Sequence, residues 1–448
     1  MHLDRQGRRD FLKTLAAGAV VGFPAIVPSS ALGRDGFVAP SERIVLGAIG
    51  VGRMGSGDMR SFLSKPEVRV AAICDVQQAR QEQYQAMVNA RYKDNECKTY
   101  YDFREMLERS DIDAVMIATG DRWHALIAIA AAKRGKHMYC EKPIGLSVAE
   151  CKAVREAVNR NGVAFQLGTT RRSDVFYRQT CELVRNKRIG ELKTIMIGSG
   201  SGPGQPLYVE PKDPPPGFDY DMWLGPSPWA PYSDLRVSIA AWLQISDYGL
   251  GNLDGAWGIH DLVTAQWVND SDNTGPLDVE GTGRCSSYTD IRDTPYEWTV
   301  EHTYANGVRL IHMDMDTAVK RAPEFNSIVP APNGAAVIYG TEGWIYVARE
   351  GIVTNPPSLA TERIGPNQIQ LTRSNDHHLN FLNAIRTGQQ TICNVEVAVR
   401  AQEIAQMEYI SLCLGRKLRW DPVAEQFIGD AEANRFLTRV MRSPWELP

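Results

Sequence analysis

The feature that most constrains the fold is a glycine pattern that follows an apolar run near the start of the chain. The run IVLGAIG leads directly into GVGRMG, so Gly50, Gly52 and Gly55 have the spacing of a phosphate-binding turn. Gly50 permits the tight turn, Gly52 lets a pyrophosphate approach the backbone, and Gly55 allows close packing of the following helix. We therefore predict a dinucleotide site here, with Arg53 and Met54 beside the glycines. The alternative is a glycine-rich tight turn that binds nothing.

The next apolar run, VRVAAICD, ends at Asp75, about twenty residues further on, where such folds place a carboxylate. Asp75 would bind the hydroxyls of the adenine ribose and repel a 2′-phosphate. Val76 and Gln77, which follow it, carry no positive charge. The expected cofactor is therefore NAD, with NADP less favoured, although Arg53 or Arg80 could reach this place.

Further buried-strand patterns, DAVMIAT, KHMYC and VAFQLG, alternate with helix-like stretches up to residue 167. The helix-like stretches are 59–63, 77–89, 103–109, 124–134 and 148–159. Alternation at this spacing predicts a doubly wound parallel sheet with helices on both faces. We expect an α/β Rossmann domain over residues 43–167.

From residue 168 the pattern changes. A helix-like stretch at 176–186 leads to IMIGSG and then to long stretches rich in proline, glycine and aromatic residues. The segments YEWTVEHTYA, VRLIHMDM and AAVIYGT then alternate in polarity, which is typical of antiparallel strands with one buried face. We expect an α+β domain over 168–448 with a large, mostly antiparallel open sheet, and with final helices at 378–386 and 395–414.

The first residues carry a targeting pattern. Arg8 and Arg9 in GRRDFLK precede a moderately apolar stretch that is too short for a spanning helix. We interpret residues 1–31 as a twin-arginine signal peptide that engages the Tat export machinery, followed by a linker over 32–42; a disordered basic tail is the alternative. The mature protein would then be periplasmic or otherwise exported, with no membrane attachment after processing.

Composition excludes several functional classes. A net charge of −4 and a pI near 6.1 give no basic field, so no nucleic-acid partner is expected. The eight cysteines lack the paired spacing of a zinc site, so we predict no metal. Cys74, Cys140 and Cys413 stand in apolar contexts and are expected to be buried thiols. The even number of cysteines would permit disulfides in an oxidising compartment, without assigning any pair.

A lysine follows the strand pattern KHMYC. Lys142, in CEKP, would lie at the carboxyl edge of the parallel sheet, where doubly wound folds bind their ligands. Its ammonium could orient a substrate hydroxyl and help to move the hydroxyl proton. A solvated lysine in a turn before proline is the alternative.

These motifs together resemble one family. GVGRMG, Asp75, GDRWHA and CEKP, in this order, are similar to the glucose-fructose oxidoreductase/inositol dehydrogenase family (Gfo/Idh/MocA). QLGTTRRSD, YDMWLGPSPW, TAQW, TYANGV, HHLNFLNAI and LGRKLRWDPVAEQFIGDAEANR resemble a secreted bacterial subgroup of it. The resemblance covers nearly the whole chain after the signal segment. It implies that Lys142 is catalytic and that His124, with Thr119 and Glu141, lies near the cofactor. It also implies that the C-terminal sheet carries substrate residues and the contacts of a homo-oligomer, a dimer or tetramer.

The family's second catalytic element is an Asp-x-Gly-x-His stretch, followed three residues later by another aspartate. In this chain His260 fits the histidine, whereas the two aspartates fall on Ala256 and Val263. A neutral imidazole is suited to accept a hydroxyl proton, so we take His260 as the general base, with Lys142 assisting. A core histidine bonded to the backbone is the alternative.

Several pocket residues depart from the resemblance. Asp254 or Asp261 could replace the missing carboxylates, while Ser238 and Ala241 stand where the subgroup would carry a histidine and an arginine. Arg171 has no match to a family arginine, unlike its neighbour in QLGTTRRSD. The expected substrate contacts are Arg172, Asp261 and Trp223. The other aromatic residues that could line a sugar site, although such clusters are more often core, are Tyr220, Trp229 and Trp242.

Export of a folded protein would require NAD to be loaded beforehand and kept, and a cofactor that cannot exchange must be reoxidised in place. We therefore expect an NAD(P)-dependent oxidoreductase that transfers hydride between a tightly bound cofactor and a hydroxyl carbon of a sugar, glycoside or polyol. The alternative is a redox-neutral glycoside hydrolase or lyase that acts through a transient keto-sugar. A non-catalytic sugar-binding relic, suggested by Ala256 and Val263, is the third possibility.

Overall fold

The computed structural model describes residues 39–448 apart from 201–206, 286–289 and 329–332, and it leaves the side chains of Pro40 and Cys285 undescribed. The chain divides into two units, residues 1–43 and 44–448. The predicted signal peptide and most of the predicted linker lie outside the described residues. None of the described helices is both long enough and apolar enough to cross a membrane.

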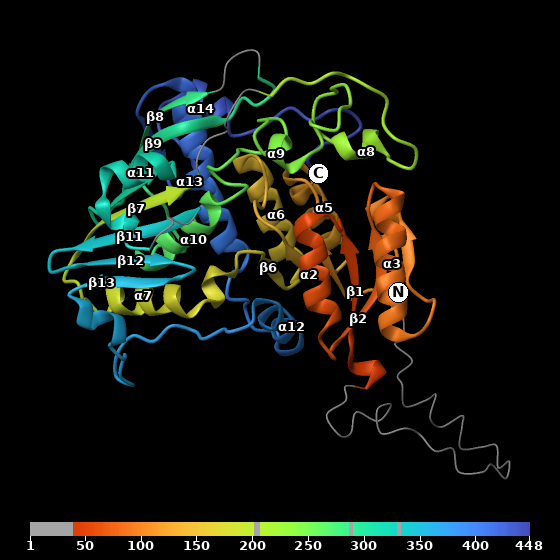
Figure 1. Cartoon of the computed structure of the whole chain (residues 1–448), viewed down its shortest axis with the longest axis horizontal. Coiled ribbons are helices and arrows are strands. Elements are labelled where there is room, and N and C mark those ends of the chain that lie inside the picture. Colours follow the sequence, from red (N-terminus) through yellow and green to blue (C-terminus); the bar gives the residue numbers. More distant parts are fainter. Residues whose placement is uncertain (1–38, 201–206, 286–289, 329–332) are drawn as a thin grey trace, which may run out of the picture. The chain divides into compact units, whose positions relative to one another are not determined.

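The first part of the larger unit is a parallel sheet of six strands in the order β3-β2-β1-β4-β5-β6 (Figure 1). The strands are β1 (Ile44–Ile49), β2 (Val68–Cys74), β3 (Lys98–Tyr100), β4 (Ala114–Ile117), β5 (His137–Cys140) and β6 (Phe165–Leu167). Because β1 pairs in parallel with both β2 and β4, the strand order reverses beside it. Doubly wound sheets bind ligands at this reversal, outside the carboxyl ends of the strands. The predicted Rossmann fold is confirmed.

Helices connect these strands. They are α2 (Arg53–Leu63), α3 (Gln78–Tyr92), α4 (Phe103–Leu107), α5 (Asp121–Lys133) and α6 (Val148–Asn161). α2 begins at Arg53, before the predicted Met59, because Gly52 of the glycine turn is its N-cap. β4 and most of β1 and β5 are buried, which explains their unbroken apolar runs. β3 was not predicted because three residues, KTY, carry too little pattern.

The second part is built on a nine-stranded sheet in the order β13-β12-β11-β7-β10-β9-β8-β14-β15. Its strands are β7 (Leu192–Ser199), β8 (Asp278–Cys285), β9 (Pro295–Thr303), β10 (Arg309–Met313), β11 (Gly334–Gly340), β12 (Trp344–Ala348), β13 (Gly351–Asn355), β14 (Leu418–Asp421) and β15 (Gln426–Phe427). Its helices are α7 (Val175–Arg185), α8 (Tyr220–Leu224), α9 (Ile239–Trp242), α10 (Gly258–Val268), α11 (Met315–Arg321), α12 (His377–Thr387), α13 (Val395–Leu414) and α14 (Ala431–Arg435).

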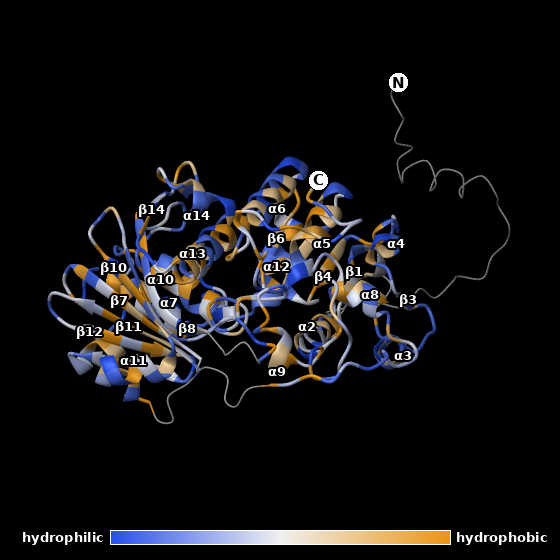
Figure 2. Cartoon of the chain, turned by 90° about the horizontal axis from the view of Figure 1, so that it is seen from above, coloured by the Kyte–Doolittle hydropathy of each residue, from blue (hydrophilic) through white to orange (hydrophobic). Residues whose placement is uncertain are grey.

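Both faces of this sheet are covered, and the strands alternate between them. On β11, Ala336 and Ile338 belong to the core beneath α10 and α13, whereas Ala335 and Val337 pack on the opposite side with Phe325 and α11. Figure 2 shows hydrophobic residues running along these strands. The prediction of one buried face is therefore wrong for β11, because alternate residues of this strand are buried in two apolar layers.

Two details differ from the sequence-based expectation. The sheet is mostly antiparallel, as predicted, but β7 and β10 pair in parallel, from Arg309 opposite Thr194 to Met313 opposite Gly198. Cys74 and Cys140 are buried, but Cys413 is exposed because it lies near the end of α13, after the last fully buried turn.

The two parts share one apolar core. α13 packs on α6 and β6 of the first sheet as well as on β8 and α10 of the second. α12 returns to the first part, where Phe381 meets Phe62 of α2 edge to face. This packing fixes the position of the second part against the parallel sheet, so side chains from both parts can meet at its carboxyl edge.

Candidate active site

The glycine turn between β1 and α2 has no room for side chains at two of its three glycines. Gly50 has φ +82°, and a Cβ there would stand 2.5 Å from the carbonyl oxygen of Ala118. A Cβ on Gly55 would stand 2.1 Å from the Gly50 oxygen. At Gly52 the nearest atom is Nη1 of Arg80, at 3.2 Å, so only a flexible side chain borders that position. The turn therefore has the shape of a phosphate cradle at the start of an 11-residue helix.

Other predicted cofactor residues border the turn. Thr119 follows β4, and its backbone nitrogen would be 2.9 Å from a Cβ on Gly50. Arg53 and Met54 form the exposed first turn of α2. The carboxyl ends of β1 and β4 and the helix start thus meet, as a dinucleotide requires.

Asp75, at the end of β2, is drawn against the same turn. Its Oδ2 accepts the N–H of Val51 at 2.9 Å and its Oδ1 accepts the N–H of Gln77 at 3.0 Å. Burial raises the pKa of this carboxyl, and Arg80 lies 4.0 Å away to offset the charge. The carboxylate of Asp75 thereby fixes the glycine turn itself, and Arg80 stands next to Gly52.

Lys142 extends from the loop after β5 to the second part of the chain. Its Nζ donates to the carbonyl oxygen of Gly255, and it stands 4.0 Å from Oε2 of Glu141. The loop is held from behind by His124, whose Nδ1 donates to the Pro143 oxygen at 2.6 Å. Burial lowers the pKa of His124 to about 4, so this imidazole is neutral. His124 thus positions the lysine loop.

His260 lies in the first turn of α10, five residues after the carbonyl that binds Lys142. Its Nδ1 shares a 2.6 Å hydrogen bond with Oγ1 of Thr169, which follows β6. Burial and then the charge of Lys142 hold the pKa of His260 well below its ordinary value. The imidazole is therefore neutral, and within the described part of the chain no residue bonds to its Nε2.

Two buried carboxyls accompany this pair. Asp254 accepts from Gln402 of α13 at 2.8 Å, and burial raises its pKa to about 6. Asp121 is the first residue of α5, and its Oδ2 lies so close to Gly255 that a Cβ built on this glycine would be 2.7 Å away. Burial, and after it the negative charge of Asp254, raises the pKa of Asp121. Asp121 was not singled out in the sequence; its place directly after β4 was the available signal.

Asp261 points elsewhere, although it adjoins His260. It forms a buried ion pair with Arg171 and accepts from Ser199 Oγ at 3.2 Å. Of the two aspartates that could replace the missing carboxylates, the structure brings Asp254 rather than Asp261 toward Lys142. Arg171, which had no family match, is therefore the arginine nearer the His260 helix turn.

Arg172 binds side chains other than Lys142 and His260. Its guanidinium pairs with Asp272 and lies over the ring of Trp267 at 5.1 Å. Both oxygens of Asp272 are bonded to it. Among the described residues, Arg172 forms no hydrogen bond or ion pair with Lys142 or His260.

Three of the predicted aromatic residues form a cluster of their own over α5: Tyr220, Trp223 and Trp242. Trp223 stacks on Tyr220, and the guanidinium of Arg122 lies 4.0 Å from the centre of the Trp223 ring. Trp229 is 69% exposed. Trp257 was missed by sequence reasoning: it is the N-cap of α10, 36% exposed, and borders the His260 turn.

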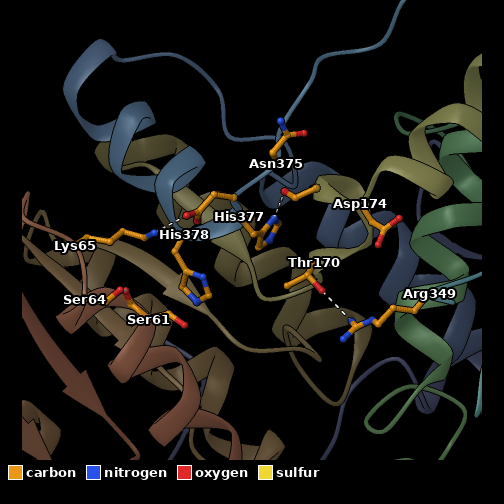
Figure 3. A pocket seen from close by; sticks show the side chains of 11 residues that line it. Ser61, Ser64, Lys65, Thr170, Asp174, Arg349, Asn375, His377 and His378 are labelled. Carbon is orange, nitrogen blue, oxygen red and sulfur yellow. Dashed lines mark hydrogen bonds and ion pairs between the residues drawn. The ribbon is translucent and has the colours of Figure 1, made fainter. Parts of the chain in front are cut away.

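An open polar cavity of about 510 Å³ is lined by Thr170, the residue after Thr169 (Figure 3). It is lined by Ser61, Ser64, Lys65, Thr170, Ser173, Asp174, Arg349, Asn375, Asp376, His377 and His378. In Figure 3 Thr170 faces Arg349, to which it is hydrogen-bonded at 3.0 Å. The cavity and the Lys142–His260 pair therefore flank the same segment after β6.

Comparison with known proteins agrees with this geometry. Residues 44–169 match the description "Oxidoreductase family, NAD-binding Rossmann fold", and residues 204–447 match "Oxidoreductase family, C-terminal alpha/beta domain" of the same family. The chain belongs to the Gfo/Idh/MocA family. It is accordingly an NAD(P)-dependent oxidoreductase, and its cofactor is NAD.

The chain is also similar to individual proteins whose names describe different activities. The uncharacterized oxidoreductase YrbE of Bacillus subtilis is 25% identical over 84% of this chain and 96% of its own length. Inositol 2-dehydrogenase of Salmonella typhimurium is 33% identical, over 45% of this chain and 55% of its own. The α-N-acetylgalactosaminidase of Shewanella oneidensis is 34% identical, over 34% of this chain and 37% of its own. The chain therefore spans about half or less of these last two proteins.

The fold also matches solved structures. Scyllo-inositol dehydrogenase from Lactobacillus casei, solved with NAD(H) and scyllo-inositol, superimposes with a TM-score of 0.58 at 17% identity, over 84% of this chain and 99% of that one.

Proposed function

We propose that this oxidoreductase oxidises and reduces a hydroxyl carbon of a sugar, glycoside or polyol, with Lys142 and His260 acting on the hydroxyl. The observation that supports this most is their convergence: Lys142, from the parallel sheet, donates to Gly255, and its charge is the one that most perturbs His260. A neutral base beside an ammonium is the arrangement that moving a hydroxyl proton needs.

The chain fits the cofactor at its glycine turn. Gly50, Gly52 and Gly55 leave the backbone open, and Asp75 with Arg80 flanks the ribose end. NAD, when bound, supplies the acceptor and donor of hydride. Lys142 would orient the substrate oxygen, and Nε2 of His260 would take its proton while Thr169 holds the ring in place.

Two further parts of the proposal come from the sequence. We propose export through the Tat pathway, supported by Arg8–Arg9 and the apolar stretch after them. We also propose that NAD stays bound and is reoxidised in place by a second carbonyl substrate, because an exported enzyme would find little free nucleotide. Homo-oligomer formation is part of the same proposal.

A redox-neutral glycoside hydrolase is the second candidate, and the match to the Shewanella glycosidase favours it. In that case a transient ketone would acidify the neighbouring C–H, the glycosidic group would leave by elimination, and water would add before hydride returns. The two candidates need the same NAD site and the same first step. They differ in whether an aglycone is released.

The test is a panel of cyclitols, free sugars and nitrophenyl glycosides added to natively purified protein. The main proposal predicts reduction of the bound nicotinamide by a free sugar or cyclitol and its reoxidation by a second carbonyl compound. Release of nitrophenol without net reduced cofactor would favour the hydrolase. A Lys142→Met protein with wild-type turnover would contradict both.

A further inference from the structure

A line of buried ionisable groups leads away from Lys142 through Glu141 toward α2. Lys142 Nζ lies 4.0 Å from Oε2 of Glu141, whose side chain is only 5% exposed. Asp58, on the buried face of α2, has the charge that, after burial itself, most raises the pKa of Glu141, to about 8. Burial and the Asp58 charge thus both favour the protonated form of Glu141.

Glu141 and Asp58 each have one buried carboxyl oxygen without a hydrogen bond from the described residues. Among the described residues none forms a hydrogen bond with Oε2 of Glu141, which has only the 4.0 Å ion pair with Lys142, or with Oδ2 of Asp58, although both atoms are buried. Buried carboxyl oxygens are normally satisfied, and an exception calls for an explanation such as a shared proton or an internal water. Tyr139 lies beside both carboxyls; burial raises the pKa of its phenol, and the charges of Asp58 and Glu141 raise it further.

His378 continues the line to the surface. Its Nε2 donates to Oδ1 of Asp58 at 3.0 Å, and its ring stacks on Tyr139 with centroids 4.9 Å apart. His378 also lines the open cavity, where Figure 3 shows it between Lys65 and Ser61. Asp58 and Ser61 are three residues apart in α2 and so share one face of the helix, and Lys65 follows just after the helix end, so the cavity begins where the buried carboxyls end.

We propose that Glu141, Asp58 and His378 form a proton route that connects Lys142 with water in this cavity. The inference rests on the proposed function, because oxidation of a carbinol releases one proton for each hydride. It adds to that function a use for the HHLNFLNAI segment, which the substrate chemistry does not employ.

The proton balance is as follows in the oxidising direction. The substrate O–H bond breaks and its proton goes to His260, while the electron pair of the C–H bond leaves as hydride to NAD. Glu141 gives its proton to Asp58, and Asp58 passes one to His378, which releases it to the cavity. Glu141 is refilled by the ammonium of Lys142, and Lys142 by His260. Reduction of the second substrate runs the same steps backwards, so no further oxidant is needed.

Other charges face this route and set its energetics. Asp121 adds to the negative field on Glu141, while Lys142 opposes it. Near the outlet, Lys65 is paired with Asp376, and His377 donates its Nε2–H to the Leu167 oxygen at 2.8 Å. His377 is buried and neutral, with its pKa lowered to about 4, so it is no proton carrier at physiological pH. Both histidines line the cavity, and His378 is the one that bonds to Asp58.

The route can be tested without any substrate. Infrared spectroscopy of the NAD-loaded protein should show a carboxylic acid band that is absent from a Glu141→Gln variant. On dilution into D₂O the band shifts as the acid proton exchanges. We expect this exchange to slow by about tenfold or more in Asp58→Asn and in His378→Phe, which keeps the ring stack. Added imidazole should restore the rate in His378→Ala.

A matched control is His137→Gln, at the opposite end of β5, where exchange should keep the wild-type rate with or without imidazole. Wild-type exchange in Asp58→Asn and His378→Phe, with unfolding midpoints preserved, would overturn the route. So would a band that persists in Glu141→Gln. Neither result would touch the proposed sugar chemistry, and a failure of every sugar to react would leave the exchange result unaffected.

Discussion

Gly52→Ala separates cofactor binding from folding more cleanly than any other change in the glycine turn. Gly52 has φ −69°, which alanine adopts without strain, and its added Cβ would approach only Nη1 of Arg80, at 3.2 Å. We therefore expect the free energy of unfolding of the cofactor-free protein to change by no more than about 0.5 kcal/mol. The methyl group would nevertheless stand where the pyrophosphate must approach the backbone. We expect NAD affinity to fall by about tenfold or more, that is, by at least about 1.4 kcal/mol.

Two neighbouring glycines provide the controls. A Cβ on Gly57, in the same helix, meets nothing within 4 Å, so Gly57→Ala should bind NAD normally and stabilise the protein by about 0.5–1 kcal/mol. Gly55→Ala places a Cβ 2.1 Å from a backbone oxygen and should destabilise the fold itself. The measurements are urea unfolding of cofactor-free protein and calorimetric titration with NAD. If Gly52→Ala binds NAD as tightly as the wild type, the pyrophosphate does not lie over this turn.

Three other predictions concern single groups. His260→Asn should keep a polar partner for Thr169 but lose the base, so kcat on a reactive sugar should fall by about 10²–10⁴-fold; an unchanged kcat would exclude His260. Glu408 accepts hydrogen bonds from His302 at 3.1 Å and from His312 at 2.8 Å, and all three side chains are fully buried. Glu408→Gln should therefore lower the free energy of unfolding, measured in urea, by about 3–5 kcal/mol. A decrease of less than about 1 kcal/mol would show that the cluster rearranges around the amide. Burial lowers the pKa of His124 to about 4 in the folded protein, against an ordinary 6.5, so as the pH falls the unfolded protein takes up this proton before the folded protein does. The free energy of unfolding should therefore fall by about 3 kcal/mol between pH 6.5 and pH 4 because of His124. His124→Asn should remove this part of the pH dependence, which urea unfolding at several pH values would measure.

The first part of the fold was predictable because its signals are local. Each strand of the parallel sheet except β3 is an apolar run bounded by turn residues, and the glycine spacing identifies the turn at β1. The second sheet was predictable only as a class. Its pairing of β7 with β10 joins strands far apart in sequence, and short strands such as β15, with two residues, exist only because β14 holds them.

The candidate site shows the same division. Lys142 and His260 stand in recognisable motifs, whereas their neighbours are assembled by tertiary packing. Asp58 and His378 are 320 positions apart and meet only because α12 returns to the first part of the chain. Adjacent arginines illustrate the limit further: Arg171 and Arg172 share one turn, but they pair with different aspartates, and no sequence pattern distinguishes their directions.

The most direct test of the whole account is a crystal structure of the protein loaded with NAD. The account predicts the pyrophosphate over Gly52, the adenine ribose beside Asp75 and the nicotinamide between Lys142 and His260. A dinucleotide bound elsewhere, or a nicotinamide ring out of reach of both side chains, would contradict it.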